Sequence, residues 1–185
     1  MIRSIHVLAF VSLFTTLTLA PQIASAQVKP FKISGCGIAD AMPLTPGQVV
    51  AHQSVGVATQ LGAHTGQGRL KLGIFTSPTT ATFSSEVPYV FKAANGDQLA
   101  CTYGLDGTTV TGKVELFRPN PLLPIAYAVF VAEFKPVPAQ CTGRFAKVIG
   151  GSFLMTAVSE PFDLRNPVNV RYCWEGDGTL KFATR

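Results

Sequence analysis

The sequence predicts an all-β protein, and three observations support this prediction. Turn pairs of the Asn-Gly and Asp-Gly type, at Asn95-Gly96 and Asp106-Gly107, separate runs that are rich in β-branched and aromatic residues. Apolar and polar residues alternate within these runs, which is the pattern of half-buried strands. Such runs, punctuated by glycine, fill most of the chain and leave room for at most one helical turn.

The runs amount to about eight strands in sequential order. An antiparallel sheet of this size removes both of its exposed edges by closing, so we predict an eight-stranded up-and-down barrel. A two-sheet β-sandwich is the alternative, because strand counts do not separate the two architectures. The interior of such a barrel is filled by side chains or holds one small ligand, so a binding site is expected there.

The first predicted strands follow a short leader over residues 27–35. A long β-type run covers Val49–Leu61, and Arg69–Phe75 alternates as the next strand. Between them the segment His64–Gly68 is expected to form a turn.

The centre of the chain is predicted to form two consecutive hairpins. A type I′ turn at Asn95-Gly96 joins a strand over Thr79–Lys92, interrupted at Pro88, to a strand that ends at Tyr103. The turn at Asp106-Gly107 then introduces a strand over Thr108–Arg118. One face of the first strand is expected to carry Phe83, Val87, Tyr89 and Phe91.

The C-terminal part begins with the loop Arg118–Pro124, whose three prolines rule out a central strand. A strand over Ile125–Phe134 follows, and Thr142 is expected to cap a single helical turn that ends at Gly150-Gly151. The last strands are predicted at Phe153–Val158 and Val168–Glu175, before a Gly-Asp-Gly turn and a terminal run.

Residues 1–26 have the three parts of a secretory signal peptide. Arg3 precedes the apolar run Val7–Ala20, and Ala24 and Ala26 form an A-x-A cleavage site. The run is shorter than the roughly 20 apolar residues of a membrane-spanning helix. We therefore expect a secreted or periplasmic protein with one domain over residues 27–185 and no transmembrane segment.

The four cysteines, Cys36, Cys101, Cys141 and Cys173, all lie in the predicted mature part. An even number in an exported chain predicts two disulfides, with the pairing open among three connectivities. The spacings match neither a C-x-x-C redox motif nor a zinc knuckle.

The formal net charge of +5 falls to +4 without Arg3, and the remaining basic residues are scattered. Nucleic-acid binding normally requires a basic stripe or tract, so we do not expect it here. His52 and His64 are too few for a histidine-rich metal site, and His52 is expected to face solvent. We expect no metal and no cofactor, and no surface pattern establishes an oligomeric state.

Three segments carry a resemblance to a known family: LGIFT (Leu72–Thr76), AANGDQL (Ala93–Leu99) and TGRF (Thr142–Phe145). Their order and spacing resemble exported bacterial proteins with an allene oxide cyclase-like (dirigent-like) β-barrel. The resemblance implies a closed barrel, but it implies no catalytic residue, since the active-site patterns of the named enzymes do not match. The chain also departs from the pattern at Ile74 and at Cys141.

Few residues are candidates for chemistry. Asp97 is expected to bond backbone amides at the hairpin, and Arg144 either binds an anion or closes the end of the barrel through carbonyl groups. Glu133 and Tyr127 share one strand face, and they would form a general-acid pair if that face pointed inward.

The first functional hypothesis is a non-catalytic exported barrel, either a structural module or a binder of a small apolar ligand in its lumen. A cyclase or isomerase that acts by confining its substrate is the second, and an envelope-interaction module is the third. The candidate ligand-binding residues are aromatic: Phe83, Tyr89, Phe91, Tyr103, Tyr172 and Trp174.

Overall fold

A computed structural model of the chain describes residues 26–104 and 112–184. The signal peptide predicted over residues 1–26 and the turn predicted at Asp106-Gly107 therefore lie, apart from Ala26, outside the described residues. No helix within the described part of the chain has the length and apolarity that crossing a membrane requires.

The described strands form a closed, antiparallel, eight-stranded barrel, which confirms the predicted architecture. Each strand pairs with the strands beside it in the order β3-β2-β1-β10-β8-β7-β5-β4, and a pairing between β3 and β4 closes the ring. The strands are β1 (Ala26–Ala41), β2 (Val49–Ala58), β3 (Gly62–Phe75), β4 (Thr80–Ala93), β5 (Gln98–Tyr103), β6 (Lys113–Phe117), β7 (Ile125–Pro136), β8 (Val148–Ser159), β9 (Phe162–Asp163) and β10 (Val168–Ala183).

Segments β5 and β6 are two parts of a single barrel strand. Both lie between β4 and β7, β5 at one end of these strands and β6 at the other. β5 ends at Tyr103 and β6 begins at Lys113, and a Cβ on Gly104 would lie 3.0 Å from the Cα of Gly112. The predicted second hairpin is therefore wrong, because β6 does not pair with β5.

The Asn95-Gly96 hairpin is confirmed, but its turn is not of type I′. Only Gly96 has a positive φ, of 89°, and the loop contains the four residues between Ala93 and Gln98. The Asn95 side chain accepts a hydrogen bond from the Asp97 amide at 3.1 Å. This arrangement fits the longer hairpin loops, in which one residue after the turn adopts the left-handed conformation.

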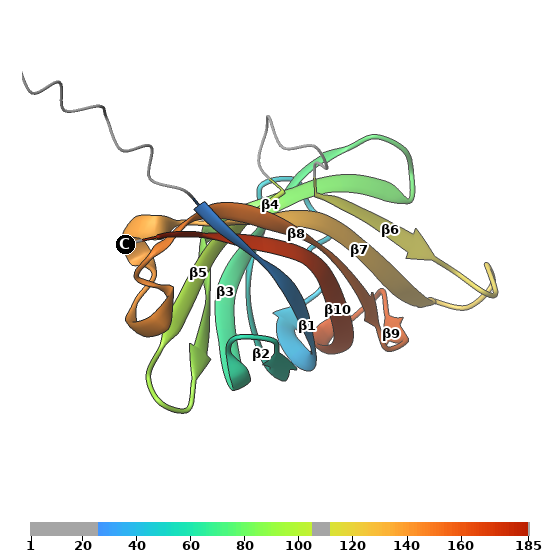
Figure 1. The fold of residues 1–185 in the computed structure, drawn as a ribbon. Coiled ribbons are helices and arrows are strands. Elements are labelled where there is room, and N and C mark those ends of the chain that lie inside the picture. Colours follow the sequence, from blue (N-terminus) through green and yellow to red (C-terminus); the bar gives the residue numbers. More distant parts are fainter. Residues whose placement is uncertain (1–25, 105–111, 185) are drawn as a thin grey trace, which may run out of the picture.

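The first and last strands are longer than the sequence predicts, and they lie side by side along their whole length (Figure 1). The predicted leader over residues 27–35 belongs to β1, and the predicted Gly-Asp-Gly turn lies inside β10. Glycine is needed in β10 because a Cβ on Gly178 would overlap the carbonyl oxygen of Ser152. Glycine in these strands therefore marks close backbone approach rather than a turn.

Two further predictions in the β3–β4 region are wrong. His64–Gly68 lies inside β3, where Gly66 and Gly68 leave room for the ring of Tyr89. Val87 is 41% exposed instead of inward, because the register between β3 and β4 shifts on either side of Arg69.

One end of the barrel is closed by a clasp that joins two of the sequence motifs. Arg144, in a 3₁₀ turn over Gly143–Phe145, donates from Nε to Asp97 Oδ2 at 2.6 Å and from an η-nitrogen to the Gln60 carbonyl at 2.8 Å. Hydrogen bonds from Asn95 and Arg144 hold the pKa of Asp97 below its ordinary value. Phe145 is fully buried beneath the clasp. Arg144 thus closes the barrel, which was one of its two predicted roles.

The structure contains one of the two predicted disulfides. Cys36 and Cys173 are bonded and face each other across β1 and β10, on the exposed outer face of the barrel. Cys101 and Cys141 are buried free thiols. Burial raises the pKa of both thiols, so neither forms a thiolate readily at neutral pH.

The clasp can be tested with matched glycine substitutions. Gly143 and Gly47 both have positive φ, of 60° and 83°, but only a Cβ at Gly143 meets neighbours, where it would overlap the Asp97 carboxylate. We expect Gly143→Ala to lower the free energy of unfolding by about 3 kcal/mol and Gly47→Ala by about 1 kcal/mol, measured by urea denaturation. Equal losses would show that the Asp97 contact contributes nothing.

Thiol titration can test the cysteine assignment. We expect two thiols per chain to react with a disulfide reagent in urea without reductant, because only Cys101 and Cys141 are free. In the folded protein both should react slowly, since both are buried. A chain with no reactive thiol in urea would instead have a second disulfide.

Candidate functional site

A cavity of about 80 Å³ lies inside the barrel, in the half where β1 ends and β2 begins. Its wall is built from the inward residues of most strands and is apolar nearly throughout. The lining residues from the barrel strands include Ala39, Val50, Leu70, Phe83, Phe130, Ala132, Phe134, Met155, Ala157 and Val170. For comparison, an engineered protein cavity of about 150 Å³ stays dry and binds benzene.

The β1–β2 connection, Met42–Gln48, covers this end of the barrel, and we call it the strap. Its first residue donates a backbone hydrogen bond to the Pro167 carbonyl at 2.7 Å, next to β10. Gly47, near its other end, donates to the Leu72 carbonyl in β3 at 2.8 Å. Met42 and Pro43 are buried and line the cavity. The cavity therefore lies between the strap and the packed aromatic core.

His52 and two tyrosines form a hydrogen-bonded cluster in the cavity wall. His52 Nδ1 lies 3.0 Å from the hydroxyl of Tyr172, and His52 Nε2 lies 3.0 Å from the hydroxyl of Tyr103. Nearby, the hydroxyls of Tyr89 and Ser54 are 2.8 Å apart. The prediction that His52 faces solvent is therefore wrong: it shares the inward face of β2 with Ser54.

Burial keeps the cluster uncharged at neutral pH. It lowers the pKa of His52 to about 4 and raises the pKa of Tyr89 to about 12. Burial also raises the pKa values of Tyr103 and Tyr172. No formal charge therefore faces the cavity from these groups.

A neutral imidazole has one N–H and one bare nitrogen, so His52 donates to one tyrosine and accepts from the other. The tyrosine that accepts from His52 can donate its own O–H to a backbone carbonyl: Tyr172 to Gln53 or Tyr103 to Arg69, each at 3.4 Å. The hydroxyl of Ser159, which also lines the cavity, accepts from the Ala128 amide at 2.8 Å. These polar atoms bond to one another or to backbone, and carbon atoms form the surface that a ligand would meet.

The six predicted ligand-binding aromatics all belong to the interior, but only three of them line the cavity. Phe83, Tyr103 and Tyr172 do so. The other three pack in the core: Tyr89, Phe91 and Trp174 are buried, with ring centroids 4.8 Å apart for Tyr89–Phe91 and 6.0 Å apart for Phe91–Trp174.

The predicted general-acid pair lies on the wrong face of β7 for a lumenal site. Phe130, Ala132 and Phe134 line the cavity, so the alternation of the strand places Tyr127 and Glu133 on its outer face. Glu133 lies 3.6 Å from Lys135 Nζ, and Tyr127 stacks on Phe117 with centroids 5.1 Å apart.

The structure adds cavity residues that the sequence interpretation missed. Met42 and Pro43 lie outside any strand, and Ala132 and Ala157 are small residues within apolar runs. Alanines at alternate positions of β7 were an available signal, because small inward residues leave space in a barrel that aromatics otherwise fill. Within the described residues, no group of three or more His, Cys, Asp or Glu side chains could hold a metal ion.

Comparison of the chain with models of protein families, with curated proteins and with solved structures finds no match. The resemblance to allene oxide cyclase-like proteins therefore has support only from the eight-stranded antiparallel barrel itself.

The buried state of His52 predicts a loss of stability in mild acid. The unfolded ring takes up its proton near pH 6.5, but the folded ring does so only near pH 4, so between these values protonation favours unfolding. Between pH 7.5 and pH 4.5 we expect the wild type to lose about 2.5 kcal/mol more unfolding free energy than His52→Gln, measured by urea denaturation. His64, whose pKa burial also lowers, contributes equally to both proteins. Parallel losses would mean that His52 titrates normally.

Proposed function

We propose that the protein binds a small apolar ligand in the cavity beneath the strap. The main support for this proposal is the apolar wall of the cavity, in which the polar groups of His52, Tyr103 and Tyr172 bond to one another. Such a wall stabilises a bound ligand through the hydrophobic effect and dispersion, but it offers no hydrogen-bond or ion-pair partner to a buried charge. The ligand is therefore uncharged where it enters the barrel.

The alternatives from the sequence have less support. A cyclase or isomerase that acts by confinement would suit a cavity inside the barrel, but the groups able to move a proton beside it are turned toward each other. Cleavage of the predicted signal peptide would release the protein outside the cytoplasm, into water, in which an apolar compound is poorly soluble. A binding role is consistent with that location and with the allene oxide cyclase-like resemblance of the barrel.

Ligand-observed NMR with benzene, hexane and hexanoate can test the proposal. We expect benzene and hexane to bind, and hexanoate at pH 7 to bind at least tenfold more weakly, because burying its carboxylate without a partner costs more than about 1.4 kcal/mol. Ala157→Phe should abolish hexane binding by filling the cavity, since Ala157 is part of its wall.

The matched control is Ala63→Phe, which adds the same ring to an exposed position of β3. Hexane should bind this variant as it binds the wild type, with circular dichroism reporting that both variants are folded. Equal affinity for hexane and hexanoate, or binding that survives in folded Ala157→Phe, would contradict the proposal.

A further inference from the structure

The outer face of the barrel carries an unbroken apolar row across four strands. Cys36 pairs with Val55 on one side and with Cys173 on the other, and Cys173 pairs with Val158. Val55 is 63% exposed and Val158 is 45% exposed, and the disulfide between them is also exposed. Exposed apolar side chains that lie next to one another in this way are a candidate interaction site.

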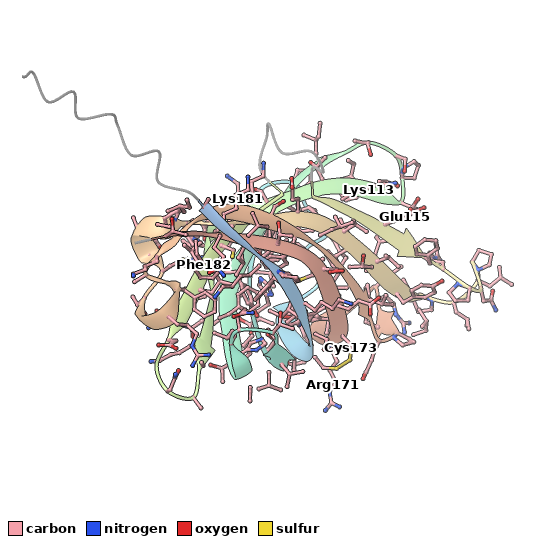
Figure 2. The ribbon with its side chains drawn as sticks, viewed as in Figure 1. Lys113, Glu115, Arg171, Cys173, Lys181 and Phe182 are labelled. Carbon is pink, nitrogen blue, oxygen red and sulfur yellow. A yellow bond between two sulfur atoms is a disulfide. The ribbon has the colours of Figure 1, made fainter. Side chains whose placement is uncertain are left out.

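On each of the two central strands, a basic residue lies on one side of this row and an acidic residue lies on the other side. On β10, Arg171 lies two residues before Cys173 and Glu175 lies two residues after it. On β1, Lys32 lies four residues before Cys36 and Asp40 lies four residues after it. Figure 2 shows Arg171 and Cys173 on the outer side of β10. All four charged side chains are exposed, and none of them is in an ion pair with another described residue.

We propose that this face binds a second copy of the chain, around a two-fold axis that runs along the apolar row. Rotation about this axis brings residues on one side of the row against those on the other side in the second copy. Arg171 then meets Glu175 of the other copy, and Lys32 meets Asp40. The symmetry repeats each pair, so four opposite-charge pairs surround the apolar centre.

The charges do not fit a two-fold axis perpendicular to the row. An axis along β10 would place Arg171 against Arg171 and Glu175 against Glu175, and like charges opposed at an interface cost several kcal/mol. In the proposed arrangement Asp177, the remaining carboxylate on β10, faces the exposed Asn169 of the other copy. No like-charge pair therefore arises along β10. A lipid surface or an unrelated partner does not require this self-complementarity, which is why we assign the face to a second copy.

Two charge reversals give a direct test by sedimentation velocity. The wild type should be a dimer at micromolar concentration. Arg171→Glu opposes Glu to Glu175 twice, and Glu175→Arg opposes Arg to Arg171 twice. Each variant alone should therefore self-associate more than about a hundredfold more weakly. An equal mixture of the two restores both opposite-charge pairs, so a mixed dimer should form.

The control is Lys113→Glu on β6, which changes the net charge as Arg171→Glu does but lies away from the row (Figure 2). It should leave the dimer unchanged, and Trp174 fluorescence should report the same fold in every variant. A wild type that stays monomeric, including one that binds vesicles as a monomer, would overturn the proposal. Single variants that still dimerise, or a mixture that stays monomeric, would also overturn it.

Discussion

The large aromatic rings fit inside this barrel because neighbouring strands carry glycine where the rings lie. Gly66 and Gly68 of β3 border the ring of Tyr89, and a Cβ on either would lie 2.5 Å from that side chain. On β1, a Cβ on Gly37 would lie 2.6 Å from the hydroxyl of Tyr172. These contacts set the positions of two tyrosines around His52. The neutral hydrogen-bonded wall of the cavity, on which the proposed binding of apolar ligands depends, follows from that packing.

The two ends of the barrel are built on different physical principles. The clasp of Arg144 and Asp97 closes one end with charged and backbone hydrogen bonds, over the buried ring of Phe145. The strap covers the other end with Met42 and Pro43, and a space remains beneath it. A ligand that displaces the strap breaks a few backbone hydrogen bonds, whereas one that enters at the clasp must also separate an ion pair. For the proposed ligand, we therefore expect exchange with solvent at the strap.

The sequence was sufficient for the barrel and its inward aromatics, and insufficient for the site. Alternation identified Phe83 and Tyr103 as inward, because a strand has two faces and aromatic side chains belong on the buried one. His52 and Ser54 share one face of β2, and the sequence interpretation assigned His52 to solvent because polar residues on a strand normally face water. Only the facing tyrosines, from strands distant in sequence, reveal that this polar pair is inside. Met42 lines the cavity from a loop, and a loop has no hydrophobic periodicity from which its position could be predicted.

The pairing of β1 with β10 has a consequence for the connectivity of the fold. These strands are neighbours along their full length, and a disulfide joins them covalently, so the ring of strands has no structural first or last member. Ala26 lies opposite Ala183, close enough for a short peptide linker. The barrel is therefore compatible with circular permutation, in which the chain is joined there and reopened between β5 and β6, the two segments of one barrel strand. Connectivity could change at that point while every strand pairing stayed the same.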